Sequence, residues 1–307
     1  MKSSKVCVIG LGGQSAFISV DRFPVPGETV SARGLFFVLG GKGYNQAVAC
    51  ARMGVKTVFI GAVGEDAYGD ACREALEKEG IEVCLLRKQE PTAFACITID
   101  SHGENTVQVY PGAAKALSPA DLRSEAVMTH LRSCGWLLLQ NELSAECLKE
   151  ACAIGAELGL QVIVNPAPAE HMPPEVLRSC CLLTPNYGEA KQLAGFSQDR
   201  QPDAGTLAEA FRSRGIRRAV ITLGEAGALV IDADAQQSVP AYRCAAPVDT
   251  TGAGDTFNGV LTAALAEGKT LAEAARMGAV AAGIGVTRKG AVGSIPYRDE
   301  IDRGMQR

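Results

Sequence analysis

The 307-residue chain lacks the features that mark several large classes of protein. Its longest apolar run, around 278–286, is far shorter than the ~20 residues that a membrane-spanning helix needs. It has no run of basic residues, and its net charge of −4 does not suggest a nucleic-acid surface. The N-terminus passes directly into a short apolar strand and not into a secretory segment. We therefore expect a cytoplasmic protein with neither membrane nor nucleic acid as a partner.

The chain also lacks the spacing of a metal or redox site, although it contains eleven cysteines. No two cysteines are arranged as Cys-x-x-Cys, and most lie inside apolar stretches. The three histidines are scattered at 102, 130 and 171. This pattern favours buried thiols in a reducing compartment over a metal site or a set of disulfides.

A nicotinamide-binding motif is missing as well. The turn Gly10-Leu-Gly-Gly13 follows a buried strand, but Ser15 stands where the motif needs its third glycine, and no helical pattern follows. With 47% hydrophobic and 21% charged residues, the composition is that of an ordinary globular protein.

Strands and helices alternate along most of the chain. This alternation predicts a mostly parallel central sheet with helices on both faces, and such sheets bind ligands beyond the carboxyl ends of their strands. The expected strands are 6–10, 57–61, 82–86, 135–140, 161–165, 219–223 and 228–231, and the expected helices include 44–53, 67–79, 119–131 and 144–158. Two further segments, about 14–38 and 92–110, contain strands outside this alternation and predict a small separate sheet.

The stretch 247–258, Pro-Val-Asp-Thr-Thr-Gly-Ala-Gly-Asp-Thr-Phe-Asn, is the strongest candidate for a reactive site. Gly252-Ala253-Gly254 reads as a tight turn that opens a helix, and the free N–H groups of a helix N-terminus bind anions. Asp255 follows at once and could accept a proton from an attacking hydroxyl. By itself, however, the pattern also fits an acidic residue that merely stabilises a helix N-terminus.

Three other motifs each have a structural alternative. Asn186 and Glu189 start a helix and could simply cap it. The strand-turn-strand with Thr222, Gly224 and Gly227 could be a plain hairpin, and Glu142 could be a surface acid. The glycine-rich segment 40–43 is no Walker A loop, because a glycine follows Lys42 where Ser or Thr is required.

Two signatures in this order resemble those of the PfkB family of carbohydrate kinases, in particular its ribokinase-like members. One is Asp249-Thr-Thr-Gly-Ala-Gly-Asp255, and the other is Gly40-Gly-Lys-Gly-Tyr-Asn-Gln-Ala47. The similarity extends over the whole chain. It implies a single ribokinase-like domain over 1–307, with a three-layer α/β fold and the small sheet as a lid over the sugar. It also implies transfer of the γ-phosphoryl group of ATP to a primary hydroxyl of a small sugar, Mg²⁺ with ATP, K⁺, and a homodimer formed through the lid.

The resemblance also assigns roles to residues. Asp255 is implied as the base, with Gly252, Ala253 and Gly254 stabilising the transferred group. The sugar contacts implied are Gly13, Ser15, Gly41, Lys42, Gly43, Asn45, Glu142 and Asp255. The implied ATP contacts are Asn186, Thr222, Gly224, Gly227 and Gly254. Asn186 and Glu189 are implied to hold Mg²⁺ largely through water, and the implied K⁺ loop contains Asp249, Thr251, Gly285, Arg288, Gly290 and Ser294.

The chain departs from the family pattern on the side that recognises the sugar. Ribokinase-like enzymes usually have Asn and Asp where Gly13 and Ser15 stand, and Tyr44 replaces a small residue. Loss of a charged acceptor for a sugar diol should cost about 1.5–3 kcal/mol. The sequence thus leaves open a nucleoside or other non-ribose kinase. A non-catalytic sugar-binding or regulatory protein is the alternative from a different class.

Overall fold

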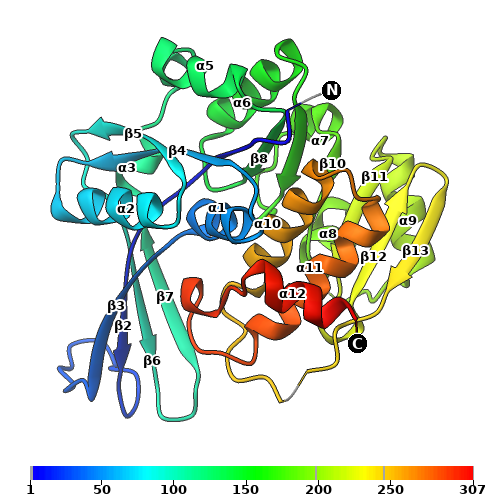
Figure 1. The fold of residues 1–307 in the computed structure, drawn as a ribbon. Coiled ribbons are helices and arrows are strands. Elements are labelled where there is room, and N and C mark those ends of the chain that lie inside the picture. The colour runs from blue at the N-terminus through cyan, green and yellow to red at the C-terminus, as the bar shows by residue number, and fades with distance from the viewer. Residues whose placement is uncertain (1–2, 198, 245, 307) are drawn as a thin grey trace.

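The central feature of the fold is a nine-stranded sheet, seen in a computed structural model that describes residues 3–197, 199–244 and 246–306 (Figure 1). The strand order is β13-β12-β11-β10-β9-β8-β1-β4-β5. β12 runs antiparallel to β11 and β13, whereas the other neighbours pair in parallel, which confirms the predicted mostly parallel sheet. The strands are β1 (Val6–Ile9), β4 (Thr57–Gly64), β5 (Glu82–Lys88), β8 (Trp136–Gln140), β9 (Gln161–Asn165), β10 (Leu182–Leu183), β11 (Arg218–Thr222), β12 (Ala228–Asp232) and β13 (Ala235–Val239).

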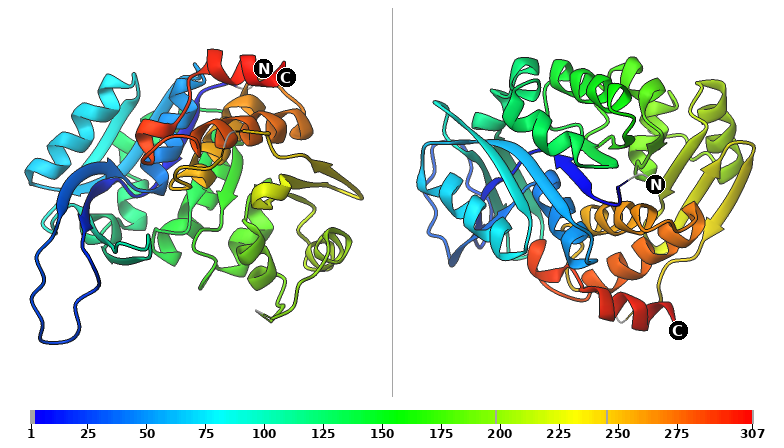
Figure 2. Two further views of the ribbon diagram at one scale, coloured as in Figure 1. Left: turned by 90° about the horizontal axis from the view of Figure 1, so that it is seen from below. Right: turned by 45° about the horizontal axis from the view of Figure 1, so that its top comes forward.

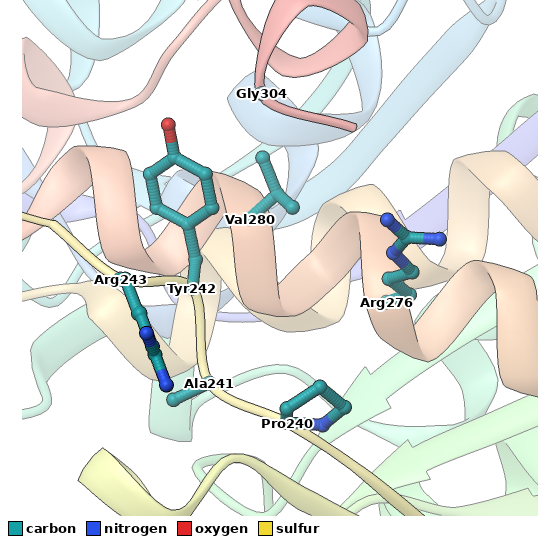
Figure 3. Close-up of a pocket in the computed structure, with 7 residues that line it drawn as sticks. All are labelled: Pro240, Ala241, Tyr242, Arg243, Arg276, Val280 and Gly304. Atoms are coloured by element: carbon teal, nitrogen blue, oxygen red, sulfur yellow. The ribbon is translucent and has the colours of Figure 1, made fainter. Parts of the chain in front are cut away.

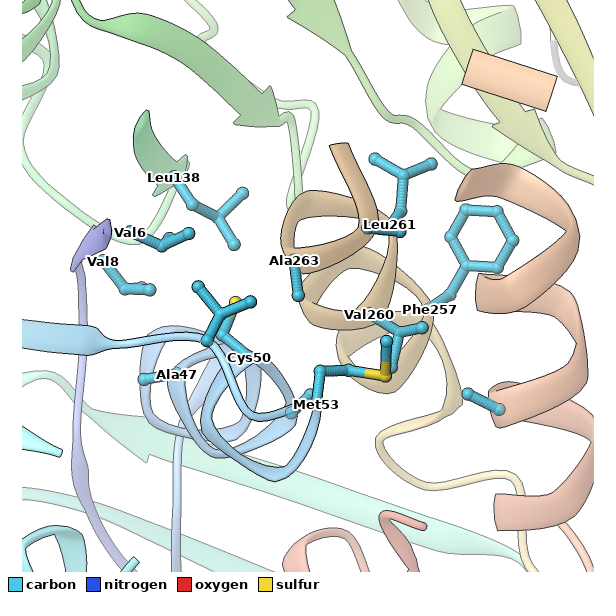
Figure 4. Close-up of a cluster of buried hydrophobic side chains, with 14 of the residues drawn as sticks. Val6, Val8, Ala47, Cys50, Met53, Leu138, Phe257, Val260, Leu261 and Ala263 are labelled. Atoms are coloured by element: carbon cyan, nitrogen blue, oxygen red, sulfur yellow. The ribbon is translucent and has the colours of Figure 1, made fainter. Parts of the chain in front are cut away.

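Helices cover both faces of this sheet, and its strands are therefore buried on both sides. Along β1, Val6 and Val8 face one hydrophobic cluster while Cys7 and Ile9 face the other. The first cluster packs under α1 (Lys42–Arg52), α2 (Ala67–Lys78), α10 (Ala253–Ala266) and α11 (Leu271–Gly285), and α12 (Arg298–Met305) packs on α11 (Figure 4). The second lies beneath α3 (Gly112–Lys115), α4 (Pro119–Leu122), α5 (Glu125–Arg132), α6 (Ala145–Glu157), α7 (Pro174–Ser179), α8 (Tyr187–Leu193) and α9 (Ala204–Ser213).

A separate four-stranded sheet confirms the second expectation. Its order is β3 (Gly34–Gly40), β2 (Gly13–Ser19), β6 (Ala93–Ile99) and β7 (Asn105–Tyr110). It stands off one side of the molecule, and the loop between β2 and β3 projects farthest (Figure 2). Within the segment 14–38, the residues from 28 onward were expected to be extended as a strand, but β3 begins only at Gly34, so that expectation was wrong at its start. The helix expected over 119–131 is divided, because Ser124 adopts an extended conformation and starts a new helix.

The carboxyl ends of the parallel strands meet at one edge, as the alternation predicts. Gln140, Asn165 and Thr222 end β8, β9 and β11. Gly41 joins β3 of the small sheet to α1 with φ of 118°, and a Cβ there would lie 2.6 Å from the carbonyl oxygen of Leu11. Only glycine fits this junction. No helix among the described residues is long and apolar enough to cross a membrane.

Candidate active site

The carboxylate of Asp255 is fixed at the N-terminus of α10. Gly252 starts the helix in the left-handed conformation, with φ of 75°. Asn45 Nδ2 donates to Asp255 Oδ2 at 2.9 Å, and Gln46 Nε2 donates to Oδ1 at 3.0 Å. The signature at 40–47 is thereby brought against the signature at 249–255, and α1 packs on α10 along the same line. Sequence reasoning assigned Asn45 to this site but gave no role to Gln46.

Asp255 opens into a cavity of about 170 Å³ at the carboxyl edge of the main sheet. Seven residues predicted from the sequence are among its lining: Lys42, Asn186, Glu189, Thr222, Gly252, Gly254 and Asp255. The lining also includes Asn165, Ala167, Thr184 and Asn258. Buried oxygens of Asn45, Gln140, Thr256 and Asn258 have no hydrogen-bond partner among the described residues. Of these four residues, Asn258 lines the cavity, where a ligand could supply the missing donor.

The positive charge of Lys42 lowers the pKa of three carboxyl groups, those of Asp255, Glu142 and Glu189. Burial raises the pKa of Asp255, although Lys42 and the amides of Asn45 and Gln46 oppose that rise. Burial raises the pKa of Glu142 to about 7, where the charge of Lys42 lowers it and that of Asp255 raises it. The backbone N–H of Lys42 also donates to Glu142 Oε2 at 3.2 Å. Glu142 is therefore close enough to Asp255 and Lys42 to interact with their charges, and it is no isolated surface acid.

Asn186 and Glu189 form a capping box, as the structural alternative predicted. Asn186 Oδ1 accepts from the N–H of Glu189 at 2.8 Å, and Glu189 Oε2 accepts from the N–H of Asn186 at 2.8 Å. Both residues nevertheless line the cavity. Burial raises the pKa of Glu189. The cap and the candidate site thus use the same two side chains.

The glycine-rich turn after β11 lies next to this cap. The N–H of Thr222 donates to the carbonyl of Pro185 at 3.0 Å, and Thr222 forms an isolated parallel bridge with Asn186. The turn contains a short 3₁₀ helix, η1 (Gly224–Ala226), and joins β11 to the antiparallel β12. A Cβ on Gly227 would lie 2.1 Å from the carbonyl oxygen of Val239. The turn is a hairpin, and its start also forms a wall of the cavity.

Comparison with known proteins identifies this arrangement. A family model described as pfkB family carbohydrate kinase matches residues 3–298. The chain belongs to this family. It is 37% identical to the ribokinase of Haemophilus influenzae over 295 residues, which are 95% of each chain. It is 32% identical to the deoxyribokinase of Salmonella typhi, with 97% of each chain covered. The structure of Arabidopsis thaliana ribokinase complexed with ribose and ATP matches with a TM-score of 0.89 at 29% identity, covering 100% of this chain and 99% of that one.

The chain is therefore a carbohydrate kinase with the ribokinase-like fold, and its departures from the family pattern can be located. Gly13 lies on β2, where a Cβ would be 2.2 Å from the carbonyl oxygen of Ala93. Ser15 is half-buried on the same strand. Neither residue is part of the cavity lining around Asp255.

The expectation that Tyr44 adds bulk near the sugar pocket was wrong. Tyr44 is only 2% exposed and belongs to the hydrophobic core. Its ring packs edge-on against Phe59, with centroids 6.5 Å apart, and lies over Gly12. The tyrosine therefore changes the packing of the core and does not line the cavity around Asp255.

The loop predicted to hold K⁺ is closed by Asp249. Its Oδ1 accepts from the N–H of Thr251 at 2.9 Å, and its Oδ2 accepts from the N–H of Gly290 at 2.8 Å. Gly285 ends α11, and a Cβ there would lie 3.6 Å from the carbonyl oxygen of Ser294 in η2 (Val292–Ser294). The predicted set is thus brought together directly before Gly252. Arg288 is turned toward Glu300, with which it forms an ion pair.

A second cavity, of about 360 Å³, lies on the outer side of α11 (Figure 3). Its lining consists of Pro240, Ala241, Tyr242, Arg243, Arg276, Val280 and Gly304. It contains no carboxyl or amide side chain that could act as a base. Among the residues that the structure describes, no group of three or more His, Cys, Asp or Glu side chains is placed to hold a metal ion.

Proposed function

We propose that this kinase transfers the γ-phosphoryl group of ATP to the primary hydroxyl of a small sugar, ribose or a related pentose, with Asp255 as the base. The observation that carries the proposal is the carboxylate of Asp255. It is held by two amide donors at a helix N-terminus that opens into the cavity. The names of the related enzymes, ribokinase and deoxyribokinase, support a pentose.

The chemistry follows from this placement. Asp255 accepts the proton of the sugar hydroxyl, whose oxygen forms a bond to the γ-phosphorus while the bond to the ADP oxygen breaks. The N–H groups of Gly254 and Asp255 lie in the first turn of α10 and have no intrahelical acceptor. Together with the helix dipole they stabilise the negative charge on the transferred group. Lys42, which also lines the cavity, adds a positive charge.

The residues present fit the Mg²⁺ that accompanies ATP. When bound, this ion neutralises charge on the phosphate oxygens. Glu189 uses one carboxylate oxygen for its cap, and with Asn186 it lines the phosphate side of the cavity. Mg²⁺ usually retains several waters, so these two residues would hold it mainly through water.

K⁺ is the second ion of the proposal. Asp249 and the oxygen-rich segments that contain Thr251, Gly285, Gly290 and Ser294 converge in one loop, which matches the oxygen ligands that hard cations prefer. Arg288 would contribute its backbone carbonyl. A cation there would stiffen the turn at Gly252 without touching the sugar.

The second candidate for the substrate is a compound other than ribose. Gly13 and Ser15 offer no carboxylate to a vicinal diol, which favours a sugar that lacks one of the two hydroxyls or presents them differently. A 2-deoxypentose is the first such candidate, and a nucleoside is the second.

Activity measurements test these proposals directly. Asp255→Asn should lower kcat by about 10²–10⁴-fold and leave ATP affinity nearly unchanged, while the exposed Asp199→Asn serves as the matched control. Retained turnover in Asp255→Asn would exclude this residue as the base. ADP release with ribose, deoxyribose, hexoses and nucleosides then identifies the acceptor, and stimulation by none of these compounds would overturn the sugar-kinase assignment for this chain.

The small sheet completes the proposal as a lid and dimer surface. Its two edge strands expose large apolar side chains: Leu35, Phe36 and Phe37 on β3, and Val107, Val109 and Tyr110 on β7. Open edges with apolar side chains are protected by pairing, so a homodimer through the lid follows. The buried thiols, such as Cys7 and Cys50, suit a reducing cytoplasm.

A further inference from the structure

A chain of buried amide groups leads from the main sheet to Asp255. Gln140 ends β8 and is paired in register with Asn165, which ends β9. Gln140 and Gln46 are fully buried, and Asn165 is 5% exposed. Gln140 Nε2 donates to Gln46 Oε1 at 2.8 Å, and Gln46 Nε2 donates both to Asn165 Oδ1 and to Asp255 Oδ1, each at 3.0 Å.

The direction of every amide in this chain is determined by its neighbours. Asn165 Nδ2 donates to the backbone carbonyl of Thr184 at 2.8 Å, and a carbonyl can only accept. The oxygen of Asn165 therefore faces Gln46, and the NH₂ group of Gln46 must be the donor in this hydrogen bond. Both hydrogens of that NH₂ are used, one by Asn165 and one by Asp255. The oxygen of Gln46 then faces Gln140, which must donate.

Burial of the Gln140 side chain lowers the stability of the folded protein, because one of its polar atoms is unpaired. Its Oε1 is buried and has no hydrogen-bond partner among the described residues. Space for this oxygen exists because Gly10 and Gly43 lack side chains, since a Cβ on either would lie 2.2 Å or 2.9 Å from it. An apolar residue would avoid the unpaired acceptor. The polar side chain therefore needs a reason, and within the described part of the chain its only hydrogen bond is the one to Gln46.

We propose that Gln140 is a positioning residue for the base: by donating to Gln46, it keeps the NH₂ group of Gln46 turned toward the carboxylate of Asp255. This inference rests on the proposed role of Asp255. Without the donor at position 140, the buried oxygen of Gln46 loses its partner, and only the acceptors Asn165 and Asp255 still orient the amide. The amide is then held more loosely, and each rotation that brings its oxygen to Asp255 Oδ1 replaces a hydrogen bond with repulsion.

The consequence is a change in the titration of Asp255. The other charged groups that act on it are Lys42 from α1, Glu142 after β8 and Glu189 from α8, and methionine at position 140 adds no charge to this set. The hydrogen bond from Gln46 lowers the pKa of Asp255. Its loss should shift the acidic limb of the kcat profile to higher pH.

The test compares pH profiles of kcat for the full-length enzyme and the variants Gln140→Met and Gln140→Glu. Methionine fills the same volume without a donor. Glutamate is isosteric and, when ionised, attracts the NH₂ of Gln46 away from Asp255, but its charge also acts on Asp255 directly. If Gln140→Met fails to fold, Gln140→Glu is therefore compared with the double variant Gln46→Met/Gln140→Glu, which keeps the charge without the amide. We expect the acidic limb of the kcat profile to move to higher pH, so that kcat falls on the acidic side and changes little at the plateau, with the KM for ATP nearly unchanged. Thr262→Val, which removes a buried hydrogen bond of α10 to Asn258, should lower stability without moving the limb.

A double-mutant cycle decides whether Gln140 acts through Gln46. Gln46→Met should shift the acidic limb at least as far, and adding Gln140→Met to it should produce no further shift. An unchanged limb in folded Gln140→Met or Gln140→Glu overturns the inference, as does an additive shift in the double variant. These failures differ from failure of the proposed function, which is seen when Asp255→Asn remains active.

Discussion

Replacement of Glu142 by glutamine should stabilise the unliganded protein at alkaline pH but not in acid. The pKa of this carboxyl rises from an ordinary value of 4.5 to about 7 in the folded protein, mainly because of burial. Between these two values the folded state binds more protons than the unfolded state. The stability of the wild type therefore falls as pH rises through this window, by at most about 1.4 kcal/mol for each pH unit. The full penalty at pH 8 is about 3 kcal/mol, and solvent relaxation reduces it to about 1–3 kcal/mol.

Glutamine retains an acceptor for the N–H of Lys42 and removes only the charge. Urea unfolding of wild type and Glu142→Gln should therefore differ by about 1–3 kcal/mol at pH 8 and by less than about 0.5 kcal/mol at pH 4.5. For a chain of this length, each kcal/mol corresponds to about 1.5 °C in Tm. Glu209→Gln, an exposed position on α9, is the control and should change stability little at either pH. An equal gain for Glu142→Gln at both pH values would refute the reasoning, because the gain would then come from packing and not from the buried charge.

Three further predictions concern the lid and the cation loop. Gly13→Ala should separate β2 from β6, because its Cβ would lie 2.2 Å from the carbonyl oxygen of Ala93. The Tm should fall and the KM for the sugar should rise. An unchanged KM for the sugar would argue against a role of β2 in binding. Asp249→Ala leaves two N–H groups of the loop without their acceptor. It should lower kcat about tenfold or more and abolish the stimulation of activity by K⁺ relative to choline. Undiminished stimulation by K⁺ would place the cation elsewhere. Phe37→Glu on the exposed edge of β3 should convert a dimer to a monomer in light scattering, and a dimer that persists would place the interface away from this edge.

Much of the fold could be predicted because the buried strands leave a direct pattern. β4 and β9 read as continuous apolar runs, and each alternates with a helix of ordinary length. β13 was not identified, since four of its five residues are exposed and polar or small, so neither alternation nor a continuous apolar run marks it. β10 has only two residues and is visible only through its pairing with β9 and β11.

The candidate site was predictable where glycines and charges occur at fixed spacing, as in 249–255 and 40–47. The buried amides were not. Gln46 and Gln140 each lie in a segment that the sequence analysis singled out, but nothing in the local sequence says that they meet across 94 positions. A glutamine at the end of an apolar strand was the available signal, because such a residue is buried and must find partners. The packing of Tyr44 against Phe59 was equally hidden, because the two rings are adjacent only in the fold.

The cap formed by Asn186 and Glu189 shows why structural and functional explanations of a motif need not compete. A cap requires an acceptor at the first position and a carboxylate three residues later, and both end up at the N-terminus of a helix. In this fold that N-terminus lies at the carboxyl edge of the parallel sheet, where ligands bind. The cap fixes the rotamer of Glu189 and leaves part of its carboxylate for the cavity. The same side chains are then pre-oriented without further support.

The positions of the family departures indicate how the acceptor could change while the reaction stays the same. Asp255, Lys42 and the cap are held by the main sheet and by α1, α8 and α10. Gly13 and Ser15 belong to β2 of the small sheet, which is joined to α1 through β3 and Gly41. If β2 contacts the sugar as proposed, a substitution there changes that contact and leaves the hydrogen bonds of Asn45 and Gln46 to Asp255 in place. The proposed acceptor specificity and the proposed phosphoryl transfer could then change independently at these positions.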